Sequence, residues 1–101
     1  MENETKTNNI EEYEEKEVKP SNIKVRVFDL EHGLTEYEKI RYIRIKSKKY
    51  NLLIMQDYMP IIGEIEGSIN IKGETTDLNF EKIEAYYVHH DNVFNLMVKD
   101  T

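Results

Sequence analysis

Cysteine is absent from the 101 residues, which excludes a disulfide framework, a cysteine-ligated zinc site and a thiol nucleophile. Glycine and proline are scarce, with four and two residues, which excludes collagen-like and low-complexity sequences. No apolar run approaches the roughly 20 residues that span a membrane. The first ten residues contain no apolar segment of the kind that secretory signal peptides carry. These absences predict an intracellular, soluble protein.

The residues that are present describe one small acidic domain. Hydrophobic residues make up 39% of the chain and charged residues 34%, and the formal net charge is -6. A negative balance disfavours nucleic acid as a partner, because phosphates are bound by basic surfaces. Lysine, asparagine, isoleucine and glutamate dominate while arginine is sparse, a bias that resembles proteins from AT-rich bacterial genomes.

The first segment, residues 1–21, differs from the remainder of the chain. Five glutamates occupy the seven positions from Glu11 to Glu17, and apolar residues are few. Such a segment cannot bury enough apolar surface to offset the entropy lost on ordering it. We therefore expect a disordered acidic extension over 1–21 and a folded domain over 22–101. The alternative is a short partner-bound helix that ends at Pro20.

From Asn22 onward the pattern is that of β-strands. Apolar residues alternate with polar ones from Ile23 to Val27, and turn signals recur between the later apolar segments. No amphipathic helix of ten or more residues is expected in this region. The spacing predicts an all-β fold, an antiparallel β-sandwich or flattened barrel of about 8–10 short strands.

Three details refine this prediction. The apolar phase slips between Ile40 and Ile43, which predicts a β-bulge inside one long strand. The continuous apolar run Leu52–Met55 predicts a buried strand. Pro60 confines its neighbours to an edge or an irregular segment. The expected core consists of Val25, Val27, Ile43, Ile45, Leu52, Ile54 and the apolar positions of 93–98.

The sequence contains no recognisable catalytic constellation. Its glycines are isolated, so no phosphate-binding loop is present and no nucleotide or other cofactor is expected. His89 and His90 are followed by Asp91, but neighbouring side chains on a strand point to opposite faces. We interpret these histidines as surface or rim residues, and we predict neither a metal site nor catalytic residues. The seven tyrosines suit either a binding surface or half-buried packing.

Three segments carry a resemblance to a known family. The first, G-L-T-E-Y-E-K-I-R-Y-I-R-I over Gly33–Ile45, is similar to the second strand of the epsilon subunit of rotary F-type ATP synthases, G-L-V-Y-E-G-E-V-D-Y-V-R-V. The second, N-L-L-I-M-Q-D-Y-M-P-I-I-G over Asn51–Gly63, is similar to the family's E-L-G-I-L-P-N-H-A-P-L-I-T. Val88–Asp100 resembles the strand, turn and strand that close its β-domain. The resemblance covers Asn22–Asp100.

The sequence also departs from the family pattern. Leu53 and Gln56 replace a glycine and a proline, and Tyr58 replaces a histidine. Ala85 and Tyr86 stand where the family has a glycine pair. The family's two-helix hairpin, which inhibits rotation and in some members binds ATP, has no counterpart before Thr101. We therefore expect neither activity here, and an acidic N-terminal extension instead.

The resemblance implies a non-catalytic subunit of the central stalk, or rotor, that binds the foot of the gamma subunit. The implied gamma interface consists of Asp29, Tyr58, Met59, Pro60, Ile61 and Gly63. Tyrosine and methionine suit an interface, but Met59 and Ile61 are equally compatible with a core. The implied ring- or stalk-facing loop consists of Lys48, Lys49, Tyr50 and Asn51. The family has an acidic residue where Asn51 stands, so the resemblance does not extend to a contact with a membrane ring.

The resemblance further implies alpha and beta ATPase subunits in the same complex, and a peripheral position at the inner face of the cell membrane. The acidic extension favours a specialised motor, for which the F-type-like ATPases that drive gliding in mycoplasmas are a candidate. It also suggests a basic partner for the extension. The alternative function is a free-standing β-sandwich adaptor without an ATPase.

Overall fold

The computed structural model describes residues 20–99, which form an all-β fold without a helix, as predicted. The predicted extension therefore lies almost entirely outside the described residues. The six strands of the described fold are β2 (Ile23–Asp29), β3 (Gly33–Ser47), β4 (Asn51–Met55), β5 (Ile61–Gly73), β6 (Asp77–His90) and β7 (Val93–Val98).

The strands form a sheet that closes on itself. Its order is β2-β7-β6-β5-β3-β4, and an additional pairing between β2 and β3 closes five of the strands into a flattened barrel. β4 lies outside this circle and pairs with β3 alone. All pairings are antiparallel except that of β2 with β7, which is parallel, so the expected antiparallel architecture holds for every other pair.

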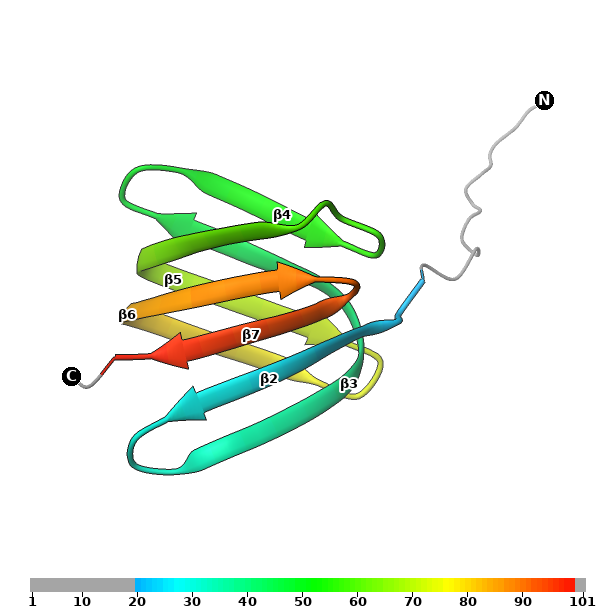
Figure 1. The fold of residues 1–101 in the computed structure, drawn as a ribbon, viewed down its shortest axis with the longest axis horizontal. Coiled ribbons are helices and arrows are strands. Elements are labelled where there is room, and N and C mark those ends of the chain that lie inside the picture. The colour runs from blue at the N-terminus through cyan, green and yellow to red at the C-terminus, as the bar shows by residue number, and fades with distance from the viewer. Residues whose placement is uncertain (1–19, 100–101) are drawn as a thin grey trace.

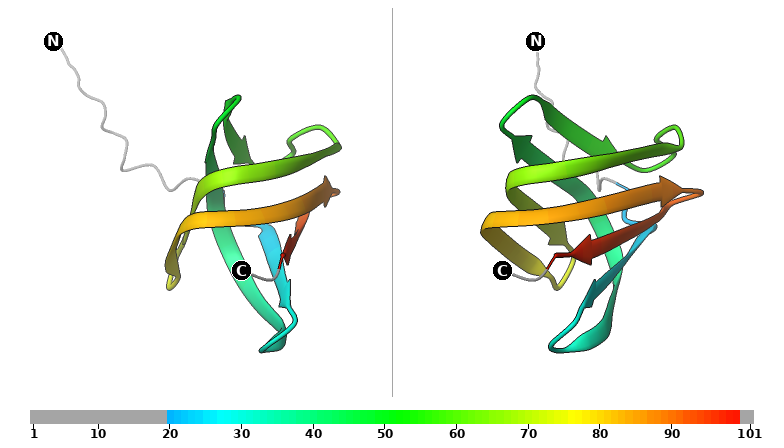
Figure 2. Two further views of the ribbon diagram at one scale, coloured as in Figure 1. Left: turned by 90° about the vertical axis from the view of Figure 1, so that its left-hand side faces the viewer. Right: turned by 60° about the vertical axis from the view of Figure 1, so that its left-hand side comes forward.

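Bends in β3, β5 and β6 turn the barrel into two layers (Figure 1, Figure 2). β3 bends at Lys39, whose φ is 59°, beside a register shift between Ile40 and Tyr42. β5 bends at a register shift that begins at Gly67, where a Cβ would collide with the carbonyl oxygen of Lys46. β6 bends at Lys82, whose φ is 56°. The strands are therefore fewer and longer than the predicted eight to ten, because each bent strand supplies two segments.

The front layer in Figure 1 contains β2, β7, residues 85–90 of β6, residues 61–66 of β5 and, beside β2, residues 33–37 of β3. The back layer contains β4 and the other halves of β5 and β6 beside residues 42–47 of β3. The core lies between the layers and consists mainly of isoleucines. Its fully buried members include Ile23, Val25, Ile40, Ile43, Ile45, Ile54, Ile65, Ile71, Phe94 and Leu96.

Most of the predicted core is confirmed, but Met97, which was expected there, is 37% exposed. The interpretation of Leu52–Met55 as a buried strand is also wrong. β4 is an edge strand, in which Ile54 is fully buried while Leu53 is 40% exposed. Leu52 is only partly buried. The apolar run was misleading because one side of this strand is covered by the core and the other side faces outward.

Candidate interaction surface

The outer face of the front layer carries apolar side chains in register across four strands. Leu34 on β3 lies opposite Phe28 on β2, which lies beside Met97 on β7. Met97 in turn lies opposite Tyr86 on β6. Directly opposite residues share one face of a sheet, so these side chains form a continuous row. In the next row, Val88 on β6 lies opposite Ile62 on β5. We call this set the apolar face: Phe28, Leu34, Ile62, Tyr86, Val88 and Met97.

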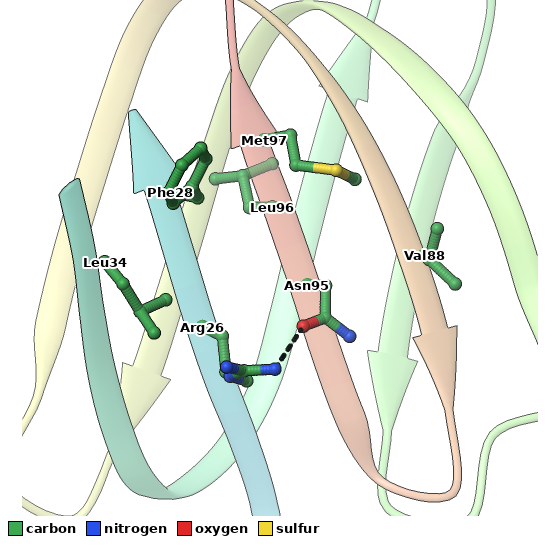
Figure 3. A pocket seen from close by; sticks show the side chains of 7 residues that line it. All are labelled: Arg26, Phe28, Leu34, Val88, Asn95, Leu96 and Met97. Atoms are coloured by element: carbon green, nitrogen blue, oxygen red, sulfur yellow. Dashed lines mark hydrogen bonds between the residues drawn. The ribbon is translucent and has the colours of Figure 1, made fainter. Parts of the chain in front are cut away.

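The side chains of the apolar face are unusually exposed to solvent for large apolar residues. Phe28 is 49% exposed, Leu34 48% and Ile62 75%. A shallow groove of about 490 Å³ runs between β2, β7 and β6 beside Phe28, Leu34 and Met97 (Figure 3). Single exposed apolar residues are ordinary, whereas a contiguous patch marks an interaction surface.

The charged groups around the apolar face are paired with one another. Arg26 donates from Nε to Glu36 Oε2 at 3.0 Å, and its Nη1 lies 3.5 Å from Asn95 Oδ1 (Figure 3). At the opposite side, Lys99 Nζ donates to Glu64 Oε2 at 2.8 Å and lies 4.4 Å from the centre of the Tyr86 ring. The hydrogen bond from Lys99 lowers the pKa of Glu64. These pairs frame the apolar face with mutually satisfied charges.

The outer face of the back layer is different in chemistry. A groove of about 360 Å³ there is lined by Arg44, Lys46, Ser68, Asn70, Asn79 and Glu81. These side chains are hydrated readily and need no covering partner. The contrast between the two outer faces identifies the front layer as the one whose outer face suits an apolar partner.

The structure separates Asp29 from the other predicted gamma-interface residues, which are close together in the segment 58–63. Asp29 ends β2, where its carboxylate accepts a hydrogen bond from the backbone N–H of His32 at 2.5 Å, which lowers the pKa of Asp29. Tyr58, Met59 and Pro60 form the loop between β4 and β5, at the opposite end of the molecule (Figure 1). Met59 is 65% exposed, whereas Tyr58 packs partly against the core.

The two remaining predicted interface residues, Ile61 and Gly63, lie on the inward-facing side of β5. Ile61 packs against the core. A Cβ on Gly63 would lie 2.5 Å from the Tyr87 hydroxyl oxygen, so this glycine makes room for a buried ring. Ile62, which the sequence reasoning omitted, points outward between them. The sequence could have indicated that Ile62 faces outward, because side chains alternate between the two faces of a strand and both neighbours of Ile62 face inward.

The predicted ring- or stalk-facing loop is the hairpin between β3 and β4. Lys48 and Lys49 are exposed at its tip, Asn51 is exposed at the start of β4, and Lys48 pairs with Glu66 at 3.1 Å. Tyr50 is different, because its hydroxyl donates to the Glu64 carbonyl at 2.8 Å and lies 3.0 Å from the Tyr87 hydroxyl. Tyr50 therefore fastens the hairpin to the barrel.

His89 and His90 point to opposite faces as predicted, but the expectation that both lie on the surface or rim is wrong. His89 is fully buried, and neither ring nitrogen has a hydrogen-bond partner within residues 20–99. Its ring lies among Tyr58 and Phe94, with centroids 6.4 and 6.0 Å away. Burial, and secondarily the charge of His90, lowers the pKa of His89. The described residues hold no group of three or more histidine, aspartate or glutamate side chains placed to bind a metal.

Comparisons with known proteins support the fold. No family model and no curated protein matches the sequence. Among solved structures, the chain is similar to a chain from the cryo-EM structure of the mitochondrial ATP synthase of Tetrahymena thermophila, central stalk and c-ring. The TM-score is 0.64 at 15% sequence identity, over 82% of this chain and 67% of the other. No helix in the described part of the chain has the length and apolarity needed to cross a membrane.

Proposed function

We propose that this chain is a non-catalytic rotor subunit of a rotary ATPase, resembling the epsilon subunit of F-type enzymes. The observation that carries the proposal is the apolar face, displayed on a fold that is similar to a chain from an ATP synthase central stalk. The sequence resemblance over Gly33–Ile45 and Asn51–Gly63 points independently to the same family.

In this proposal the apolar face binds the foot of the gamma subunit. Aromatic and methionine side chains are enriched at protein interfaces, and Phe28, Tyr86 and Met97 lie in one row at the centre of this face. We include in the same contact the exposed Met59, which lies in the loop that leads into β5. Asp29 contributes by holding the turn that follows Phe28.

Co-purification from the source cell tests this proposal. We expect a tagged chain to bring down gamma together with the alpha and beta subunits. Phe28→Glu should abolish that recovery, because a carboxylate buried against an apolar partner loses its hydration. Asn79→Glu, on the polar groove of the back layer, is the matched control and should leave the recovery unchanged. Both variants should melt at the wild-type temperature, because both positions are exposed.

A free-standing adaptor is the second candidate, because an apolar face fits any apolar partner. Recovery of a stable partner without ATPase subunits, again lost in Phe28→Glu, would favour this alternative. Equal recovery of the ATPase by Phe28→Glu and the wild type would refute the assignment of the apolar face to gamma.

Within a rotary ATPase the chain would lie in the cytoplasm, peripheral to the inner face of the cell membrane. The departures from the epsilon pattern at Leu53, Gln56 and Tyr58, together with the acidic extension, favour a specialised motor, such as one that drives gliding. Imaging the tagged chain in the source cell distinguishes a distribution over the whole membrane from one confined to a motile structure.

A further inference from the structure

β4 presents an edge that no described residue covers. It pairs with β3 on one side and is the last strand of the sheet on the other (Figure 1). Natural edge strands are usually protected by charges, prolines or bulges. β4 reads Asn-Leu-Leu-Ile-Met and contains none of these.

The register defines which backbone groups face the open side. Ser47 N–H donates to the Tyr50 carbonyl at 2.8 Å, so the hydrogen-bonded positions of β4 continue at Leu52 and Ile54. The intervening residues, Asn51 and Leu53, direct their N–H and C=O groups away from β3. Leu53 is therefore the centre of an unpaired edge.

The edge of β5 along residues 61–66 also has no neighbouring strand, but part of it is already hydrogen-bonded to the hairpin between β3 and β4. The Glu64 carbonyl accepts the Tyr50 hydroxyl, and the Glu66 carbonyl accepts the Lys48 N–H at 3.0 Å. The Glu66 N–H donates to Ser47 Oγ at 3.0 Å. The hairpin between β3 and β4 thus occupies the β5 edge at Glu64 and Glu66 and leaves the β4 edge open.

The two sides of β4 differ in chemistry. On the inner side, Leu52 is partly buried, and Tyr58 and Ile61 are likewise only partly covered against the core. On the outer side, Arg44 lies opposite Leu53 and Lys46 lies opposite Asn51. The ion pairs among residues 20–99 engage neither Arg44 nor Lys46.

We infer that β4 is a second interaction surface, which accepts an extended segment of another protein as an additional strand. The segment alternates apolar with acidic residues. Its backbone bonds to Asn51 and Leu53, its apolar side chains cover Leu52, and its carboxylates lie beyond Leu53, within reach of Arg44 and Lys46 across about two strand spacings. This surface belongs to the back layer, so it is separate from the apolar face.

Amide hydrogen exchange tests this inference with a short synthetic peptide of alternating glutamate and valine. In the free chain the Leu53 amide should exchange fast while those of Leu52 and Ile54 are protected. Saturating peptide should slow exchange at Leu53 about tenfold or more, because only that edge gains hydrogen bonds. A lysine–valine peptide should have little effect. Unchanged exchange at Leu53 with the glutamate–valine peptide would overturn the inference.

Two substitutions at one position separate backbone pairing from side-chain contact. Leu53→Pro removes the outward N–H without breaking a bond to β3, so the variant should fold and lose peptide binding. Leu53→Thr keeps the N–H and should keep binding. If Leu53 is protected without peptide, in proportion to a dimer seen by analytical ultracentrifugation, the occupant is a second copy of this chain and the acidic partner is refuted.

Discussion

The burial of His89 makes the stability of this domain depend on pH in a defined window. A histidine in the unfolded chain titrates near pH 6.5. His89 has no exposed surface and no hydrogen-bond partner for either nitrogen, and burial lowers its pKa in the fold. As the pH falls below about 6.5, the unfolded state therefore binds a proton that the folded state does not, and the free energy of unfolding falls.

A difference of one bound proton between the two states changes the free energy of unfolding by about 1.4 kcal/mol per pH unit. Lowering the pH from 7.5 to 5.5 should therefore cost up to about 1.4 kcal/mol, since only the last unit lies below the unfolded pKa. Asp29 and Glu64, whose pKa values are lowered from 3.8 and 4.5, lose their stabilising contributions only at more acidic pH. Between pH 5.5 and 6.5, the change in the free energy of unfolding therefore reports the protonation of histidine and not that of the two carboxylates.

Urea denaturation followed by circular dichroism at pH 7.5 and 5.5 measures this difference. His89→Phe should remove most of the pH dependence, whatever its effect on stability at pH 7.5. His90→Gln is the matched control, because His90 is the exposed neighbour on the same strand, and it should keep the dependence. The reasoning fails if the wild type is equally stable at both values, or if His89→Phe retains the full slope.

Three further predictions concern packing and the extension. Gly63→Ala should lower the free energy of unfolding by about 1–3 kcal/mol, because the new methyl group overlaps the Tyr87 ring, and wild-type stability in urea would contradict this close approach. Ile54→Ala should cost about 2–5 kcal/mol and Leu53→Ala under about 0.5 kcal/mol, and equal losses would show that β4 is not half-exposed. Deleting residues 1–19 should leave the melting temperature nearly unchanged, whereas unfolding of the truncated chain would move the domain boundary.

Local patterns in the sequence were sufficient to predict much of the fold. The alternation of Ile23, Val25 and Val27 identified the inward face of β2, and the phase slip after Ile40 identified the bend of β3. Both signals arise within one strand. The edge position of β4 could not be read in this way, because it depends on which strands pair with their neighbours across the sheet.

The apolar face was missed for a related reason. Phe28, Tyr86 and Met97 come from three strands separated by up to two thirds of the chain, and each alone is an ordinary exposed residue. Only the register between β2, β7 and β6 makes them neighbours. His89 was misjudged because a polar residue such as histidine is compatible with a surface position. Only the surrounding Tyr58 and Phe94 show that it is enclosed.

The parallel pairing of β2 with β7 has a consequence for how the protein is made. Among the described strands, β2 is synthesised first and β7 last, yet they lie side by side and close the barrel. During translation, the barrel cannot close until Val98 has emerged from the ribosome. Until then, β2 and β6 each have one unpaired edge. Contacts between residues so distant in sequence also form slowly. A nascent chain of this protein therefore remains exposed to wrong strand pairing until the end of β7 has emerged.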